Sequence, residues 1–280
     1  DVALGYEATG GYELFRPEDA GQYRQCLDRR EDINRILKEM TGLAETFVEA
    51  DADLPGLGFG GMAHRLHNQA EGVLDTGRLM RSLLDKAQEV GVRWLGGIAV
   101  EGWQEDAAGV EVTTDQGWTV KTRRALIATN GLAHHLLPDW PVKPARNQVL
   151  ITHPIAGGVS WQGGYHYQEG YLYFRPVGDR ILLGGGRHWD FAGETTADLG
   201  AHEAIRAQLA RLLHEVIAPG RSLSIDRWWS GIMGVGDRKA PLIQALGQHT
   251  VAAVRLGGMG VAIGTWVGEE GARLLLGQST

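Results

Sequence analysis

Four residues in the middle of the chain carry side chains that could bind or position a charged substrate. Tyr173 and Arg175 lie in "YLYFRPV", a stretch of strand-like residues, and Arg187 and His188 directly follow the stretch "RILLGGG". A Gly-Asp pair at 178–179 separates the two stretches, which predicts a hairpin that carries both pairs to the same region of a sheet. Two interpretations stay open. The cations lie at the rim of a sheet, or they line a substrate pocket together with aromatic side chains.

A glycine turn near the C-terminus is the second feature with chemical meaning. "TVAAVRL" predicts a buried strand, "GGMG" (257–260) a turn, and "VAIGTWVGEEGARLLLG" a helix without charge in its first two turns. The dipole and free N–H groups of a helix N-terminus stabilise an electron-rich group. The turn is not G-x-G-x-x-G, and no acidic residue can follow about 20 residues on, so it is not a pyrophosphate site. An ordinary core helix after a tight turn is the alternative.

Composition excludes several classes of protein. The net charge is −7 and no long basic stretch occurs, which argues against nucleic acid as a partner. The single cysteine, Cys26, excludes an internal disulfide and fits a reducing cytoplasm, the expected location. No apolar stretch reaches the roughly 20 residues of a membrane span. The histidines lack partners at metal-ligand spacing and the serines lack a G-x-S-x-G context, so we expect no metal site and no hydrolytic chemistry.

The candidate residues must be positioned by helices and strands, and the sequence contains patterns of both kinds. Helical patterns occur at 16–40, 76–90 and 201–217, and strand patterns occur at 10–15, 109–122 (a hairpin), 124–127, 171–186, 224–233 and 250–256. The stretch 51–68 is interpreted as a loop. Segments of α/β type thus flank a middle of strands, which predicts one domain assembled from separated segments and a sheet domain inserted between them.

Taken together, these segments resemble the D-amino-acid-oxidase-like family of FAD-dependent oxidoreductases, which includes glycine oxidase, sarcosine oxidase and γ-glutamylputrescine oxidoreductase. "EGVLDTGRLMRSLLDKAQEVGV", "IAV" and "ALIATNG" are similar to the helix, strand and turn on the adenine side of the cofactor. "VKPARNQVLIT", "YLYFRP", "RILLGGG" and "RWWSGIMG" resemble strands of the substrate domain. "GGMGVAIGTWVGEEGA" is similar to the C-terminal turn and helix that approach the flavin ring.

The resemblance implies a fold, a cofactor and a reaction. The fold is α/β (α+β), with a discontinuous FAD-binding α/β domain at 70–145 and 235–280 and an inserted antiparallel-sheet substrate domain at 1–69 and 146–234. FAD would accept a hydride from the C–N bond of a small amine or amino-acid-like substrate. The implied adenine-side contacts are Val100, Ala128, Thr129, Asn130 and Gly131, and the implied flavin-side contacts are Gly257, Gly258, Met259, Gly260, Val261 and Ala262. Tyr173, Arg175, Arg187 and His188 would orient the substrate, and Arg187 or His188 would supply positive charge for oxygen or for a substrate carboxylate.

Two departures from the family pattern matter. The family begins with a βαβ unit that holds G-x-G-x-x-G. This sequence, which starts at Asp1, contains no such unit, because "PGLGFGG" (55–61) has neither a strand before it nor a helix after it; we expect at least that unit, about 30 residues, to precede the sequence. The family arginine that clamps a substrate carboxylate is absent from "RWWSGIMGVGD", which has Ile232 and Met233, and a second is absent from "GGMGVAIG". The absence of both arginines argues against a simple α-amino acid as substrate. The substrate is then an amine, or its carboxylate is bound by other residues. The competing function is that of a family-derived binding or structural protein without cofactor.

Overall fold

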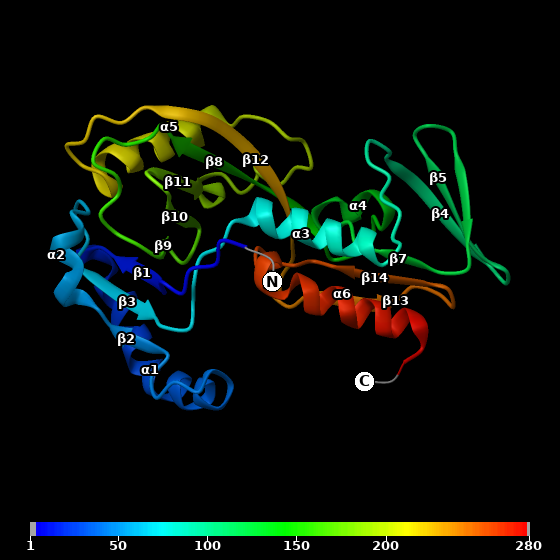
Figure 1. Ribbon diagram of the computed structural model, residues 1–280, viewed down its shortest axis with the longest axis horizontal. Helices are drawn as coiled ribbons and strands as arrows, with labels where there is room; N and C mark the ends of the chain where they lie inside the picture. The colour runs from blue at the N-terminus through cyan, green and yellow to red at the C-terminus, as the bar shows by residue number, and fades with distance from the viewer. Residues whose placement is uncertain (1–3, 279–280) are drawn as a thin grey trace. The chain divides into compact units, whose positions relative to one another are not determined.

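The chain forms two compact units, each assembled from separated segments (Figure 1). The computed structural model describes residues 4–278, so Asp1 lies outside the described residues. Unit 1 contains the described residues up to Asp85, Asn147–Asp190 and Gly200–Ser230, and unit 2 contains Lys86–Arg146, Phe191–Leu199 and the described residues from Gly231 onward. Residues 70–85, predicted for the FAD-binding domain, fall in unit 1. Residues 146, 191–199 and 231–234, predicted for the substrate domain, fall in unit 2. The mixed α/β fold class is as predicted.

Unit 1 is built on an eight-stranded sheet with the order β12-β8-β11-β10-β9-β1-β3-β2. The strands are β12 (Ile225–Val235), β8 (Lys143–Thr152), β11 (Arg180–Gly185), β10 (Leu172–Val177), β9 (Gly164–Tyr167), β1 (Gly11–Phe15), β3 (His64–Asn68) and β2 (Phe47–Glu49). β10 and β11 form the predicted hairpin. The sheet is not wholly antiparallel, because β1 and β9 run parallel. The two strands are far apart in sequence, so no hairpin turn imposes an antiparallel direction on them.

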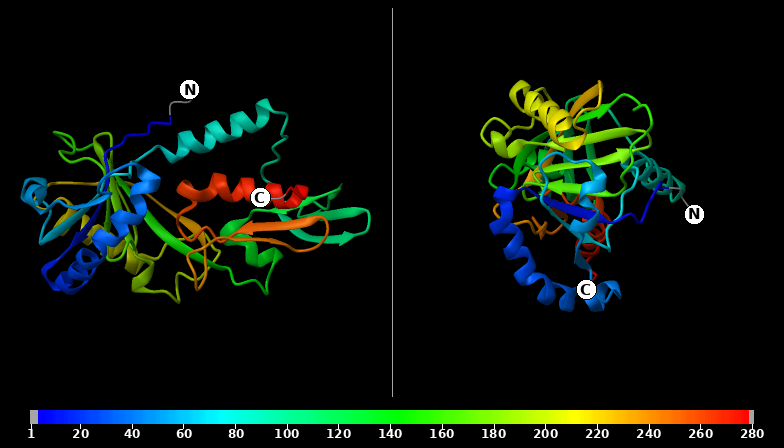
Figure 2. Two further views of the ribbon diagram at one scale, coloured as in Figure 1. Left: turned by 90° about the horizontal axis from the view of Figure 1, so that it is seen from below. Right: turned by 90° about the vertical axis from the view of Figure 1, so that its left-hand side faces the viewer.

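The two faces of this sheet have different covers (Figure 2, right-hand view). Leu14 belongs to the main core with side chains of α5 (Glu203–Leu212), which continues as a π-helical turn over Leu213–Ile217. Phe15, the next residue, packs with Tyr23 of α1 (Ala20–Thr41). Because successive strand residues point to opposite faces, α5 and α1 lie on opposite sides of the sheet.

The interpretation of 51–68 as a loop was wrong. The stretch contains a short 3-10 turn (Asp51–Asp53), a short helix, α2 (Leu54–Leu57), and strand β3, which lies between β1 and β2. β3 reads "HRLHN", without the β-branched residues that signal a strand. Its Arg65 is nevertheless buried, because the guanidinium donates to the Ala50 carbonyl (3.1 Å) and to Asp53 (3.2 Å).

Unit 2 contains two small sheets. One is a three-stranded meander of β4 (Val100–Asp106), β5 (Gly109–Thr114) and β6 (Thr119–Thr122), which includes the predicted hairpin. The other has the order β13-β14-β7, with β13 (Leu242–Ala245), β14 (Thr250–Val254) and β7 (Ala125–Ile127), and α6 (Gly260–Leu276) packs on it. Gly271 makes this packing possible, because a Cβ there would lie 2.9 Å from the Cβ of Ala253 on β14.

Two further helices complete the described chain. α3 (Thr76–Glu89) matches the predicted helix and has no buried residue. α4 (Ala133–Leu136) is a single turn that follows a 3-10 turn over Asn130–Leu132. No helix in the described range 4–278 is both long and apolar enough to cross a membrane.

Asn34 attaches α1 to the edge of the unit 1 sheet. Its buried side chain donates from Nδ2 to the Phe47 carbonyl (2.9 Å) and accepts at Oδ1 from the N–H groups of Thr46 (3.0 Å) and Phe47 (2.8 Å). One amide thus satisfies three backbone groups at the start of β2. Buried backbone groups that lose their partners cost free energy, so Asn34 holds the helix against the sheet.

We expect Asn34→Ala to lower the free energy of unfolding by about 2–4 kcal/mol, because three buried hydrogen bonds are lost together. Urea unfolding followed by circular dichroism measures the change. Glu31→Ala, one turn earlier on the exposed face of α1, is the matched control and should stay within about 0.5 kcal/mol of the parent. Equal effects of the two substitutions would show that Asn34 is not an anchor.

Candidate functional site

Two predicted contact segments begin at the same edge of the small sheet in unit 2. β7 and β14 are adjacent and parallel, with Ala125 opposite Thr250, so the turns after both strands leave from the carboxyl edge. Ligands of α/β proteins bind at such an edge. Asn130 links the turns, because its Oδ1 accepts the Leu256 N–H at 3.0 Å. Asn130 has a φ of 46°, a left-handed conformation that asparagine tolerates better than most residues.

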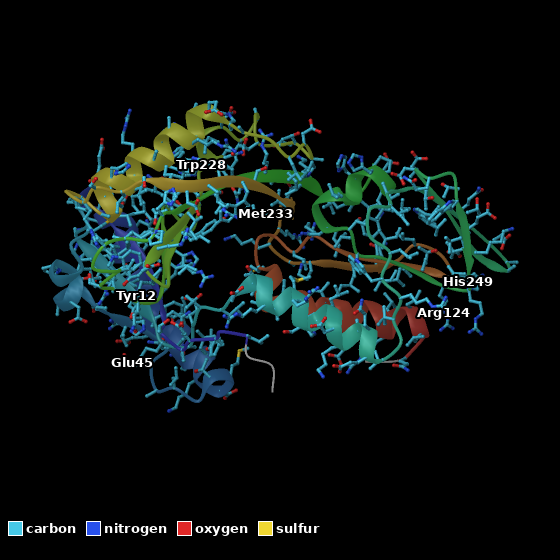
Figure 3. All side chains as sticks on the ribbon, turned by 45° about the horizontal axis from the view of Figure 1, so that its top comes forward. Tyr12, Glu45, Arg124, Trp228, Met233 and His249 are labelled. Atoms are coloured by element: carbon cyan, nitrogen blue, oxygen red, sulfur yellow. The ribbon has the colours of Figure 1, made fainter. Side chains whose placement is uncertain are left out.

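The end of β12 packs against both turns. The Gly257 N–H donates to the Gly234 carbonyl at 2.9 Å. A Cβ at Gly131 would lie 2.8 Å from the Ile232 side chain and the Met233 backbone, so the buried α-carbon of Gly131 serves this packing. The Met233 sulfur (labelled in Figure 3) would lie 3.4 Å from a Cβ at Gly258. Ile232 and Met233, where a family arginine was expected, therefore pack against glycine turns.

The start of α6 presents unused donors beside uncovered apolar side chains. Within residues 4–278, the backbone N–H groups of Gly258, Gly260 and Val261 donate to no protein acceptor. Met259 is 38% exposed and Val261 is 55% exposed. Free N–H groups at a helix N-terminus favour an electron-rich edge, and the apolar side chains suit a flat ring. The residues present therefore fit the ring of a flavin.

The predicted adenine-side residues are more dispersed. Ala128 and Thr129 are exposed directly after β7, close in sequence to Asn130. Val100 is the first residue of β4, in the meander sheet, and is 41% exposed. The G-x-G-x-x-G spacing at 56–61 follows a 3-10 turn and precedes strand β3, so it lacks the strand–turn–helix context that binds a pyrophosphate. The fit therefore concerns the two ends of a dinucleotide and not its middle.

A cavity of unit 2 was not predicted from the sequence. Arg124 and His249 (labelled in Figure 3) come directly before β7 and β14, and the Ala125 N–H donates to the His249 carbonyl at 2.9 Å. Together with Arg123 they line a cavity of about 510 Å³. It lies at the amino edge of the parallel strands, opposite the turns described above. It is therefore separate from the candidate cofactor edge.

A row of side chains crosses the unit 1 sheet on the face away from α5. Register places Glu13 of β1 opposite His166 of β9, His166 opposite Tyr173 of β10, and Tyr173 opposite Gly184 of β11. The Tyr173 ring lies over the glycine, because a Cβ at Gly184 would be 2.5 Å from the phenol oxygen. Burial raises the pKa of Tyr173 to about 12, so the phenol keeps its proton at neutral pH.

Arg175 lies near enough to two carboxylates for their charge to affect its pKa. It lies two residues after Tyr173 and so points to the same face of the sheet. Burial lowers the pKa of Arg175, while the nearby charges of Asp75 and Glu7 raise it. Glu7 and Val73 form an isolated antiparallel β-bridge, so Glu7 lies beside the segment that contains Asp75. The guanidinium therefore has protein anions beside it, which weakens its case as a clamp for a substrate carboxylate.

Arg187 and His188 gather around Tyr171. Both belong to the 3-10 turn after β11; the Arg187 guanidinium lies 5.4 Å from the Tyr171 ring centroid and the His188 ring stacks on it at 4.9 Å. His188 Nε2 lies 2.7 Å from Gln168 Oε1, while its buried Nδ1 has no partner within the described chain. Burial and then the Arg187 charge lower the pKa of His188, so the imidazole is neutral at pH 7. The structure thus brings these two residues together beside Tyr171.

Unit 2 has a carboxyl edge with free N–H groups, and unit 1 has a large sheet with polar side chains on one face. This combination fits a flavin-dependent oxidoreductase. The sequence profile of the DAO family, described as FAD dependent oxidoreductase, matches residues 1–274. The chain belongs to this family, and its cofactor is FAD.

Solved structures show the same fold at low identity. L-proline dehydrogenase from P. horikoshii matches with a TM-score of 0.77 and 18% identity, over 100% of this chain and 75% of that one. Glycine oxidase from Geobacillus kaustophilus matches with a TM-score of 0.79 and 16% identity, over 100% of this chain and 74% of that one. Iminodiacetate oxidase from Chelativorans sp. BNC1 matches with a TM-score of 0.76 and 18% identity, over 100% and 75%. No curated protein sequence matches the chain.

Substitutions at Asn130 test how the two turns of unit 2 are joined. Asn130→Gly loses the bond to Leu256 but accepts the positive φ, whereas Asn130→Ala loses the bond and is strained. We expect the alanine variant to be about 1 kcal/mol less stable than the glycine variant in thermal unfolding. Thr129→Ala, exposed and at negative φ, is the control and should change little. An alanine variant as stable as the glycine variant would contradict this account.

The pH dependence of stability tests the environment of His188. Its folded pKa lies below the ordinary value of 6.5, so the unfolded state binds the proton more readily. The neutral His188 imidazole therefore contributes its full stability to the folded state above about pH 6.5, and the free energy of unfolding decreases as the pH falls below that value. From pH 8 to pH 5, the melting temperature of His188→Gln should decrease less than that of the parent protein. The exposed control His135→Gln should show the same decrease as the parent. Identical profiles for all three proteins would refute the assignment.

Proposed function

We propose that the protein oxidises a C–N bond of an amine or amino-acid-like substrate by hydride transfer to FAD. The observation that carries this proposal is the set of unused N–H donors of Gly258, Gly260 and Val261 beside uncovered Met259. The family is that of FAD-dependent oxidoreductases, and structural neighbours are named for proline, glycine and iminodiacetate, all of which contain an amine nitrogen. These three compounds share an amine C–N bond next to a carboxylate, and the C–N bond is the one that such an oxidation would act on.

The residues of unit 2 hold and tune the cofactor in this proposal. The N–H groups at the start of α6 donate to the electron-rich edge of the ring, and Met259 and Val261 cover it from water. Val100, Ala128 and Thr129 contact the adenine side. When bound, FAD supplies the acceptor for a pair of electrons and a hydrogen nucleus. The helix dipole favours the negative charge that this acceptor gains.

The residues of unit 1 position the substrate. A neutral amine loses hydride from its carbon and a proton from its nitrogen, which leaves an imine, so no strong protein base is required once the amine is oriented. Tyr173 keeps its phenol proton and orients the amine by hydrogen bonding. His188 is neutral, which leaves Arg187 as the cation beside Tyr171. That cation stabilises negative charge on oxygen or on a substrate carboxylate.

A family-derived binding protein without cofactor is the competing function, because the one G-x-G-x-x-G spacing of this sequence, at 56–61, is not placed between a strand and a helix. Purification of the natural full-length protein separates the two. The enzyme should carry FAD, or take it up on incubation, and show the absorbance of an oxidised flavin. A colourless product that binds no added FAD would reject the enzyme.

Stopped-flow kinetics on the full-length protein test the catalytic assignment. We expect Arg187→Met and His188→Ala to slow flavin reduction by amine, flavin reoxidation by dioxygen, or both, by about tenfold or more, since each removes a group placed beside the reacting atoms. Slower reduction indicates a role with substrate, and slower reoxidation a role with oxygen. Arg227→Met, an exposed arginine on β12, is the control. Both half-reactions unchanged in both variants would make these two residues rim charges.

A further inference from the structure

A cavity of about 560 Å³ lies in unit 1 between α1 and the sheet face that carries Tyr173. Its lining includes apolar side chains from both elements: Phe15, Phe47 and Leu66 from the strands, and Ile33 from α1. Pockets for small molecules typically have volumes of about 300–1,000 Å³ and predominantly apolar walls. The cavity therefore has the size and lining for a short hydrocarbon chain.

Carboxylates are placed around this apolar lining. Glu13 comes from the middle of β1, Glu71 follows β3, and Glu169 belongs to the turn between β9 and β10. The Glu71 carboxylate lies directly over the α-carbon of Gly11, two residues before Glu13 on the same face of the strand. Neither Glu71 nor Glu169 makes an ion pair within the described chain. Two acids of the cavity are thus open to a cation.

Two arginines, Arg29 and Arg30, also line the cavity, and the buried Nε of Arg30 has no hydrogen-bond partner among the described residues. Arg30 is paired with Glu49, whose Oε1 lies 2.8 Å from its Nη1, and Arg29 is an exposed residue of α1. Burial raises the pKa of the Cys26 thiol, which lines the cavity. The charge of Glu13 raises this pKa further, and the charge of Arg29 lowers it by less. Three glutamates thus line the cavity beside two arginines, one of which is already paired with Glu49.

The cavity and the proposed reaction site share one row of side chains. Glu13 and His166 line the cavity, and His166 lies opposite Tyr173 in the adjacent strand. Glu13 and Tyr173 are thus two strand positions apart, roughly 10 Å at the usual spacing. A substrate with its reacting nitrogen at Tyr173 has its far end within reach of the cavity.

We propose that this cavity binds a second, cationic amino group of the substrate, so that the preferred substrate is a diamine or another amine with a distal ammonium group. The inference rests on the proposed amine oxidation and names its substrate class. It accords with the packing of Ile232 and Met233 where a carboxylate-binding arginine was expected, and with the protein carboxylates beside Arg175. A distal cation would find acids here, whereas a distal carboxylate would be repelled.

Binding to the 280-residue chain without flavin tests the inference directly, because every lining residue belongs to unit 1. The probes are 1,8-diaminooctane, 1,8-octanediol and octanedioate, which share one chain length and differ in charge. In isothermal titration calorimetry at low salt, the diamine should bind at least fivefold more tightly than the diol, and octanedioate should not bind detectably. Raising the salt concentration should weaken the diamine alone.

Charge-neutral variants locate the site. Glu71→Gln and Glu169→Gln should each weaken the diamine about two- to fivefold, the double variant about tenfold, and leave the diol unchanged. Glu215→Gln, an exposed acid of the π-helical turn on the other side of the sheet, is the matched control and should bind as the parent does.

Equal binding of the diamine and the diol, binding of octanedioate, lack of binding by all three probes, or variants without effect would each overturn the inference. The proposed function fails by a separate observation, namely that the full-length protein takes up no FAD. A full-length protein that is reduced by amines but whose chain shows none of the expected diamine selectivity would refute this inference alone.

Discussion

The hydrogen bond between the Leu256 N–H and the Asn130 side chain connects the two turns on which the candidate cofactor edge depends. The parallel pairing of β7 and β14 brings the turns to one edge, and the side-chain bond fixes one against the other. Gly131 and Gly257 then allow the end of β12 to pack closely against both. Because these contacts are made by backbone and small residues, the N–H groups at the start of α6 are left available to a ligand.

Unit 1 uses the two faces of its sheet for different purposes. One face is filled by the aromatic and aliphatic core under α5, which makes the sheet a rigid support. The other face carries Tyr173 and the residues that follow β11, and α1 covers only its far end, where Asn34 anchors the helix. A sheet that is packed on one side and only partly covered on the other can hold polar side chains in defined positions for a ligand.

Local sequence patterns predicted the helices and strands whose apolar residues recur at a regular spacing or whose connecting turns are short. The hairpin of β10 and β11, helix α3 and strand β14 follow from periodicity and from Gly-Asp or glycine signals within a few residues. Strand β3 was missed because its sequence is polar and Arg65 is buried through hydrogen bonds rather than through apolar packing. The parallel pairing of β1 and β9 was missed because no local signal records contacts between strands about 150 residues apart.

The sequence by itself determined the family, through the order of its weak motifs, together with the cofactor and most helices and strands. Tertiary structure decided which side chains meet. The row from Glu13 to Tyr173, the carboxylates beside Arg175 and the cavity beneath α1 all depend on strand register and on one helix docking. A shift of one residue in register would turn every one of these side chains to the opposite face, and only the packed sheet selects the register.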